Sequence, residues 1–251
     1  MVVSDRLSSS HRVPGSGVYI SPAELAKLAP TDPNRALWSV PGVSIQEEDG
    51  FGLRPNIGIR GSGVERSSRI TIMEDGILMS PAPYSAPAAY FFPNAIRMQG
   101  IEILKGSGQL LYGPFTTGGA INFLSTPIPD EFSGSIALSA GSFGHRQGQA
   151  WVGNSHKNLA YVVETSNLYS EGFKQLDGGG NTGFNRNDLM AKVRVNSNEK
   201  NGRQHALAVK IGGINEQANE SYLGLTREDA LSTPYRRYAG SQMDQISSTQ
   251  R

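Results

Sequence analysis

The chain has 251 residues, a formal net charge of +1, 18% charged residues and no cysteine. Phosphate binding needs clustered lysine and arginine, so the interspersed charges argue against nucleic acid as a partner. The lack of cysteine excludes disulfides and thiolate metal sites. The sequence has no apolar run of roughly 18 residues that would predict a transmembrane helix, and its first residues do not form a signal peptide. We therefore expect either that the chain stays inside the cell or that a signal peptide is missing from it.

The first 17 residues are rich in serine, glycine and proline, which predicts an extended leader. A short helix is expected next, over 22–28. Ser21 would be its N-cap, Pro22 its first helical residue, and Glu24 would complete a capping box.

A second helix is expected to begin at Thr31 or Asp32 and to end at residues 41–42. Its apolar face would consist of Ala36, Leu37 and Val40.

Short strands and turns alternate between residues 43 and 125, with one helical turn over 93–97. The segment 74–76 lies between two apolar runs and is typical of a tight hairpin turn. This mixture predicts a compact α+β domain. The expected strands are 43–46, 57–60, 70–73, 77–79, 101–105 and 120–124.

After Pro129 the helix signals end, and segments with a two-residue hydrophobic period follow. In the fourth segment Leu189 and Val193 would share one face, opposite Lys192 and Arg194. This pattern fits a soluble antiparallel sheet with one wet face, and it equally fits outer-membrane barrel strands. Periodicity alone leaves both readings open. The five expected strands are 132–140, 146–153, 159–169, 188–196 and 204–215.

Four stretches resemble, in order and spacing, the plug signature of TonB-dependent outer-membrane receptors. They are LWSVPGVSI at 37–45, IGIRG at 57–61, ITIMEDGI at 70–77, and IEILKGSGQLLYGPFTTGGAINFL at 101–124. The resemblance implies an α+β plug domain followed by the first antiparallel β-strands of a transmembrane β-barrel. A complete barrel of this family would have about 22 strands, so the one expected here is incomplete and the chain is expected to be a fragment.

The resemblance also implies domain limits and a set of plug-signature residues. Residues 1–17 would be the leader, 18–129 the plug, and 130–251 the first barrel strands with their extracellular loops. The signature residues are Pro41, Gly42, Arg60, Gly61, Asp75, Gly76, Glu102, Lys105, Gly106, Tyr112, Gly113, Gly118, Gly119 and Asn122.

Two of these residues, Arg60 and Glu102, suit an ion pair, although both would also be ordinary as solvated surface charges. The glycines are expected to allow close backbone approach. A nucleotide-binding loop is excluded. A phosphate-binding loop of the type GxxxxGK[ST] would need a Lys-Ser or Lys-Thr pair after a glycine, and none is present. A dinucleotide-binding GxGxxG motif starting at Gly106 would need a glycine at position 111, which is leucine.

In function, the resemblance implies uptake energised by TonB and its inner-membrane complex, in the outer membrane of a Gram-negative bacterium. The segments 74–93 and 215–225 are similar to the ferric dicitrate and ferric siderophore receptors, which implies an iron(III) chelate as the ligand and no intrinsic cofactor. The barrel would contact outer-membrane lipid. Ligand contacts at the plug apex would come from Arg66, Arg69, Pro83, Tyr84 and Ser85, and a remnant of the TonB box from Val2, Val3 and Ser4.

No enzyme or metal site is expected. The sequence has neither a G-x-S-x-G nor an H-E-x-x-H motif. The four histidines, at positions 11, 145, 156 and 205, lack ligand spacing. Two alternatives remain open: a TonB-dependent receptor for a corrinoid or an oligosaccharide, and a soluble α+β interaction module.

Overall fold

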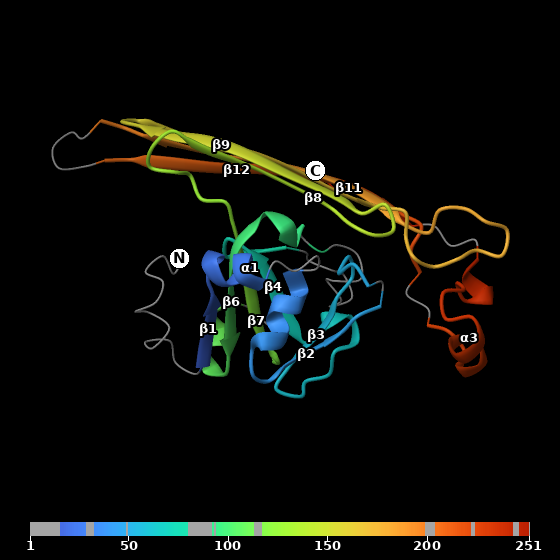
Figure 1. The fold of residues 1–251 in the computed structure, drawn as a ribbon. Helices are drawn as coiled ribbons and strands as arrows, with labels where there is room; N and C mark the ends of the chain where they lie inside the picture. The colour runs from blue at the N-terminus through green and yellow to red at the C-terminus, as the bar shows by residue number, and fades with distance from the viewer. Residues whose placement is uncertain are drawn as a thin grey trace. The chain divides into compact units, whose positions relative to one another are not determined.

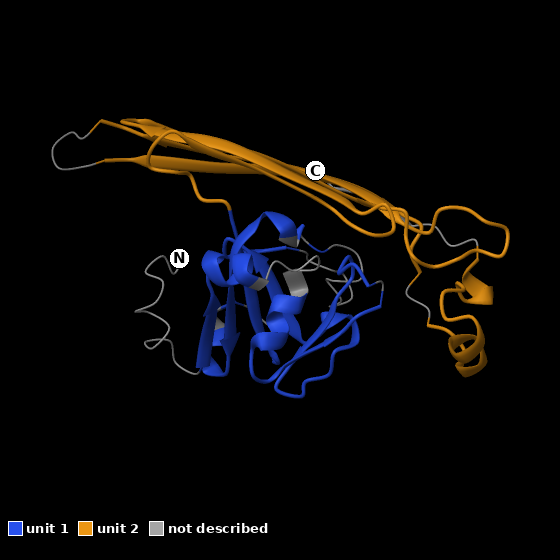
Figure 2. Cartoon of the chain, in the orientation of Figure 1, with its two compact units in different colours: residues 1–125 blue, residues 126–251 orange. Residues whose placement is uncertain are grey.

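The computed structural model describes residues 16–28, 33–48, 50–79, 92, 94–112, 117–198, 204–221, 224–242 and 246–250. The chain forms two compact units, residues 1–125 and residues 126–251 (Figure 2). Each unit has its own sheet and is described separately. Among the described residues, none of the helices is both long and apolar enough to span a membrane.

The first unit is built on a five-stranded mixed sheet with the strand order β1-β6-β7-β4-β5 (Figure 1). β4 and β7 are parallel, and the other neighbours are antiparallel. The strands are β1 (Ser16–Ile20), β4 (Ile70–Glu74), β5 (Ile77–Leu78), β6 (Met98–Lys105) and β7 (Gly119–Ser125). The sequence predicted four of the five. β1 was missed because its serine and glycine are typical of a linker.

The expected first helix is confirmed as α1 (Pro22–Leu28). Its capping box is also present: the backbone N–H of Ser21 donates to Glu24 Oε2 at 2.7 Å, and the backbone N–H of Glu24 donates to Ser21 Oγ at 3.3 Å. The expected second helix is a 3-10 helix, η2 (Pro33–Ser39), and Ala36, Leu37 and Val40 are buried.

A separate hairpin in this unit joins β2 (Val43–Gln46) to β3 (Asn56–Ile59). The described part of the unit also contains the short 3-10 helices η3 (Glu65–Ser67), η4 (Ala95–Arg97) and η5 (Ser107–Tyr112).

The core of the first unit is aliphatic, and isoleucines of β3, β6 and β7 are fully buried in it. Phe92 and Phe123 meet edge to face, with ring centroids 5.4 Å apart. Burying each large apolar side chain contributes about 1.5–3 kcal/mol, so this cluster is the main source of the unit's stability.

The second unit is a six-stranded antiparallel meander in the order β13-β12-β11-β10-β9-β8 (Figure 1). All five strands expected here are present, and β9 to β12 are 11 to 13 residues long. The strands are β8 (Ser133–Ala140), β9 (Arg146–His156), β10 (Leu159–Ser170), β11 (Phe184–Asn196), β12 (Ala206–Ala218) and β13 (Ile246–Gln250).

One expectation for this unit was wrong, because helical structure does not end at Pro129. The loop after β12 contains the helix α3 (Arg227–Ser232), with Thr226 as its N-cap. The backbone N–H of Asp229 donates to Thr226 Oγ1 at 3.1 Å.

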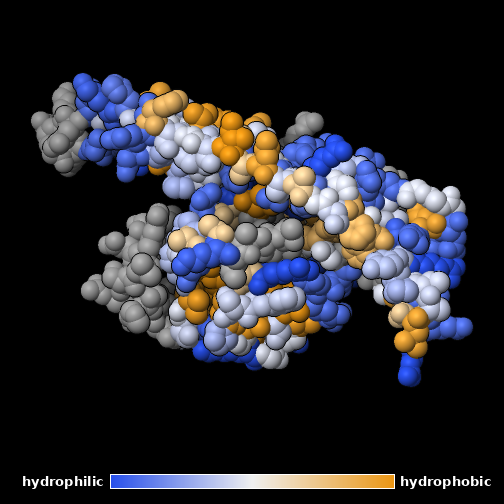
Figure 3. All heavy atoms as spheres, viewed as in Figure 1, coloured by the Kyte–Doolittle hydropathy of each residue, from blue (hydrophilic) through white to orange (hydrophobic). Residues whose placement is uncertain are grey.

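The two faces of the second sheet differ in chemistry. The register places Val152, Val163, Ala191 and Ile211 side by side on one face. Apolar side chains of this face are exposed to solvent, and some of them are seen over the long strands in Figure 3. They include Ile136, Leu138, Val152, Leu159, Val163, Leu189, Val195, Leu207, Val209 and Ile211.

The opposite face of the second sheet carries buried polar groups. Arg186 of β11 pairs with Glu216 of β12 at 3.4 Å. The side-chain amide of Gln149 donates to Glu164 Oε1 at 2.6 Å. The apolar face is therefore the exposed one, which is the reverse of a soluble sheet that packs its apolar face inward.

Candidate functional site

The turn between β4 and β5 fastens the end of β7. Asp75 and Gly76 both have positive φ, at 51° and 80°, as a tight hairpin turn of this type requires. Asp75 Oδ1 accepts the backbone N–H of Ser125 at 3.0 Å, and Asp75 Oδ2 accepts its hydroxyl at 2.6 Å. Asp75 therefore does more than make a turn, because it holds the last residue of the plug sheet.

Three signature residues continue this network across the sheet. The backbone N–H of Gly76 donates to Asn122 Oδ1 at 2.8 Å. Asn122 Nδ2 in turn donates to Glu102 Oε2 at 2.8 Å. The amide side chain uses its acceptor and its donor at once, so it links the hairpin turn to β6 through β7.

The expected pairing of Glu102 with Arg60 stays a prediction, and the described contact of the Glu102 carboxylate is this hydrogen bond from Asn122. A buried ion pair of the first unit joins Glu74 to Arg97. Its two N–H···O contacts are 2.5 and 2.8 Å long, and the side chains are only 5% and 6% exposed. The sequence did not single out this pair.

Three signature motifs that are far apart in the sequence meet at Lys105. Its ammonium donates to the carbonyl of Pro41 at 2.8 Å, and the backbone N–H of Arg60 donates to the carbonyl of Gly42 at 2.7 Å. Burial lowers the pKa of Lys105, and the neighbouring charge of Arg60 lowers it further. The motifs at 41–42, 60–61 and 105–106 are therefore parts of one region.

Two of the signature glycines are required by close packing. A Cβ on Gly118 would lie 2.5 Å from Ser62 Oγ and 2.9 Å from the carbonyl oxygen of Arg69. A Cβ on Gly119 would lie 2.9 Å from the carbonyl oxygen of Leu104. These distances are shorter than any real Cβ contact, which agrees with glycines that allow close backbone approach.

The remaining signature residues are Gly61, Gly106, Tyr112 and Gly113. Gly61 and Gly106 have positive φ, at 73° and 97°. Burial raises the pKa of the Tyr112 hydroxyl, and the charge of Glu102 raises it further. Gly113 lies outside the described residues.

The two apex arginines differ in their surroundings. The guanidinium of Arg66 lies 3.6 Å from Glu48 Oε2, and its backbone N–H donates to Asn56 Oδ1 at 2.8 Å. Arg69 is exposed, and its carbonyl accepts the backbone N–H of Gly118 at 2.7 Å. The side chain of Arg69 is therefore the more exposed of the two. Pro83, Tyr84 and Ser85 lie outside the described residues.

Asn56 and Ser67 are part of this region, and the sequence analysis missed them. The Ser67 hydroxyl donates to the carbonyl of Pro55 at 3.0 Å and accepts the backbone N–H of Ile57 at 2.9 Å. Serine and asparagine in a loop give no signal by themselves, so only their burial identifies them.

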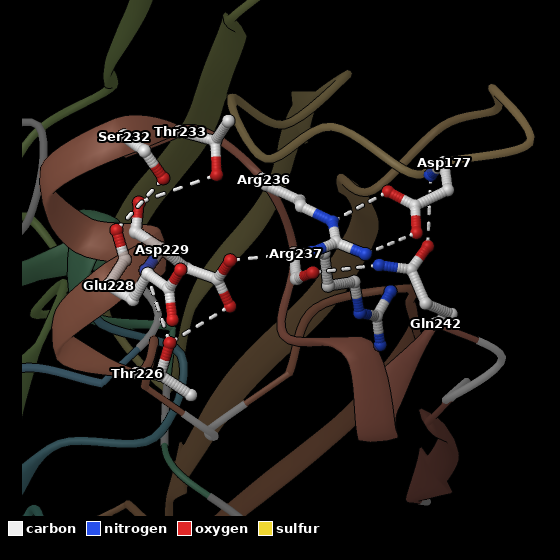
Figure 4. A network of polar contacts seen from close by, with 9 residues as sticks. All are labelled: Asp177, Thr226, Glu228, Asp229, Ser232, Thr233, Arg236, Arg237 and Gln242. Carbon is white, nitrogen blue, oxygen red and sulfur yellow. Dashed lines mark hydrogen bonds and ion pairs between the residues drawn. The ribbon is translucent and has the colours of Figure 1, made fainter.

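In the second unit, a polar network connects the loop 171–183 to the segment 219–242 (Figure 4). Arg236 makes two contacts of 2.7 Å with the carboxylate of Asp177 and one of 3.3 Å with Asp229. Arg237 is buried and donates to the carbonyl of Asn219. This network was not foreseen from the sequence.

Residues 9–120 match the family described as the TonB-dependent Receptor Plug Domain. The first unit of this chain is a TonB-dependent receptor plug domain. The match ends beside the glycines 118–119 and includes the signature residues from Pro41 to Gly119. The strands after the plug resemble the start of the barrel in solved receptors of this family.

The crystal structure of the unliganded ferric citrate transporter FecA matches 92% of this chain at 25% identity, with a TM-score of 0.73. The ferric yersiniabactin uptake receptor FyuA from Yersinia pestis matches 81% at 20% identity, with a TM-score of 0.63. The siderophore receptor PirA from Acinetobacter baumannii matches 86% at 19% identity, with a TM-score of 0.61. The chain spans about a third of the length of these proteins, with 35%, 32% and 33% covered.

These matches are transport receptors rather than enzymes. Among the described residues of the plug domain and the strands, no group of three or more acidic or histidine side chains is placed to hold a metal. The expected TonB-box remnant, Val2, Val3 and Ser4, lies outside the described residues.

Proposed function

We propose that this chain is part of an outer-membrane, TonB-energised receptor that takes up a ferric siderophore. The plug domain carries the proposal, because a plug of this family occurs within a receptor of this kind. The strands that follow it, and the likeness to solved siderophore receptors, support the same function.

The exposed face of the second sheet supports a place in the outer membrane. The exposed apolar side chains named for this face lie on strands of 8 to 13 residues, and a strand of about 9–11 residues spans the bilayer when tilted. Contact with outer-membrane lipid would cover this face. In water the same face would be an aggregation-prone surface, which disfavours a soluble interaction module.

An iron(III) chelate with net negative charge is the proposed ligand class. The likeness to the ferric citrate transporter favours a carboxylate chelate similar to ferric dicitrate. Arg69 is the described residue that we propose as a ligand contact, since its side chain is exposed whereas Arg66 lies beside Glu48. Arginine suits carboxylates because it can donate two parallel hydrogen bonds.

TonB is the proposed partner, with its inner-membrane energising complex. Val2, Val3 and Ser4 would supply an extended segment that TonB pairs with as an added strand. Ligand binding would favour one of two plug arrangements only by its differential affinity for them.

A growth panel tests the ligand class. Cells in which the gene encoding this chain is deleted should lose growth on one ferric chelate under iron limitation, and the intact gene should restore it. Rescue on a corrinoid or an oligosaccharide, with no defect on any ferric chelate, would replace this proposal with the corresponding receptor. A soluble location of the gene product would contradict both.

The role of Arg69 can be tested separately. The Arg69→Gln receptor is expected to bind the ferric chelate about tenfold more weakly, since a hydrogen bond to a charged group contributes roughly 1.5–3 kcal/mol. Arg35→Gln is the matched control, because Arg35 is also an exposed arginine of the plug but already pairs with Glu47 at 2.8 Å. Equal affinity in the two variants would remove Arg69 from the site.

A further inference from the structure

The loop after β12 leaves the sheet and returns through a narrow neck. Arg237 donates to the carbonyl of Asn219, which is 18 residues earlier in the sequence. The Arg237 side chain is 1% exposed, so this neck is buried. A long surface segment whose ends are held together in this way resembles an Ω loop, and such loops are frequently functional.

The neck is also fixed to the loop 171–183. Lys174 Nζ donates to the carbonyl of Ser221 at 2.8 Å, and it lies 3.2 Å from Glu220 Oε2. The backbone N–H of Gln175 donates to the carbonyl of Tyr235 at 2.6 Å, and the backbone N–H of Arg237 donates to the carbonyl of Gln175 at 2.8 Å. The base of the segment is therefore held by several backbone and side-chain contacts.

The tip of the segment is held differently. The helix α3 has no buried residue, and Leu231 is 80% exposed. The tip thus lacks the apolar burial that normally fixes a short helix to a protein. Among the described residues, a contact of 3.3 Å between Asp229 and Arg236 links the side chains of the tip back to the base.

Arg236 connects this tip to the opposite loop. Its Nε and one terminal nitrogen contact both carboxylate oxygens of Asp177, and its other terminal nitrogen contacts Asp229 (Figure 4). The side chain is 34% exposed, so water can compete for these bonds. Arg237, the next residue, is buried and holds the neck. The two neighbouring arginines therefore have different roles, because Arg236 links the tip to the loop and Arg237 links the two ends of the segment.

We infer that residues 224–234 form a hinged flap and that Arg236 is its latch, closing α3 onto the loop 171–183 by holding Asp177 and Asp229 together. The charged groups at the latch are Asp177 from the loop, Asp229 and the adjacent Glu228 from α3, and Arg237 from the same segment as Arg236. The inference concerns this lobe alone and does not depend on which ligand the receptor carries.

The state of the latch follows from its charges. The hydrogen bonds from Arg236 lower the pKa of Asp177 below its ordinary value of 3.8. The contribution of this carboxylate is therefore present above pH 3.8 and is lost as the pH falls through the lowered value. At neutral pH the flap is closed.

Spin-label distances in the full-length receptor test the latch. Leu231→Cys and Gly178→Cys are suitable label positions, because Leu231 is exposed and a Cβ on Gly178 meets no atom within 4 Å. This chain contributes no cysteine of its own. The distance distribution should be narrow with Arg236 present and should broaden in Arg236→Gln and in Asp229→Asn.

Arg227→Gln is the matched control, because Arg227 is an exposed arginine at the start of the same helix. It should leave the distribution narrow. Equal broadening in Arg227→Gln and Arg236→Gln, or no broadening in Arg236→Gln and Asp229→Asn, would overturn the latch.

Amide hydrogen exchange separates flap opening from unfolding of the lobe. In Arg236→Gln, exchange over residues 227–232 should rise about two- to fivefold, as expected for losing exposed ion pairs. The amides of Gln175 and Arg237 at the neck should keep their protection. If the neck loses protection together with α3, the lobe opens as one body and the hinged flap is wrong.

Discussion

The buried ion pair between Glu74 and Arg97 allows a quantitative test of the plug domain. Both side chains are nearly inaccessible, at 5% and 6% exposure, and two hydrogen bonds join them. Removing one partner leaves a buried charge without its counterion. Arg97→Met is therefore expected to reduce the free energy of unfolding by about 3–5 kcal/mol, and Glu74→Met by a similar amount.

The double variant should behave differently, because two apolar side chains of similar size leave no buried charge. Glu74→Met with Arg97→Met is expected to lie within about 1–2 kcal/mol of the unsubstituted protein. The pair Arg35 and Glu47 is the matched control, with the same residue types in the same unit but exposures of 42% and 24%. Arg35→Met should cost only about 0.2–1 kcal/mol.

Urea unfolding followed by fluorescence measures these differences. The chain has two tryptophans, and Trp38 lies in the first unit. With Trp151 replaced by phenylalanine, the signal reports on the plug domain. The reasoning is refuted if Arg97→Met costs no more than Arg35→Met, or if the double variant is as unstable as the two single variants combined.

Three further predictions concern other parts of the chain. Gly119→Ala should destabilise the plug by about 1–3 kcal/mol in the same urea assay, because its Cβ would approach the Leu104 carbonyl. Gly178→Ala in the second unit, followed through Trp151 with Trp38 replaced by phenylalanine, should change stability by less than about 0.5 kcal/mol. Hydrogen bonds from Ser21 lower the pKa of Glu24, so this capping contact is present above pH 4.5 and is lost as the pH falls through the lowered value. Ser21→Ala should return the pKa of Glu24 toward 4.5 in an NMR titration. An unchanged pKa would contradict the capping box. Ile211→Arg should reduce the amount of receptor that membrane fractionation finds in the outer membrane, whereas Lys210→Arg on the opposite face should not. Equal amounts of the two variants would argue against lipid contact.

Much of the fold could be predicted from the sequence because local signals and tertiary structure agree. The apolar alternation from Leu189 to Val195 gave β11, and the helix signals at residues 21–24 gave α1. β1 could not be predicted in this way, since residues such as Ser16 and Gly17 are not strand formers. Their strand conformation comes from pairing with β6 in the folded sheet.

The site was less predictable, because its contacts join residues that are distant in the sequence. The turn at Asp75 was foreseen, but its contact with Ser125 depends on β4 lying beside β7. Glu74 and Arg97 are separated by 23 residues, and as isolated charges they look like solvated surface groups. Hydrophobic periodicity predicts which face of a sheet a residue lies on, but it does not predict which residue of the next strand lies beside it. Pairs of this kind can be identified only when the register of the strands is known.

The helix α3 is a different case, because its signal was in the sequence. Thr226 is followed three residues later by Asp229, a spacing close to that of a capping box, and the structure shows the expected hydrogen bond. This short helix lies in a loop between strands, so the two-residue period of the strands after Pro129 carries no information about it.

Uptake of radiolabelled iron tests the central claim most directly. Cells that carry the full-length receptor should accumulate iron from a ferric carboxylate chelate, and this accumulation should fall to background when either the receptor gene or TonB is deleted. Accumulation that is unchanged in both deletions, across ferric chelates of every class, would contradict a TonB-energised ferric siderophore receptor.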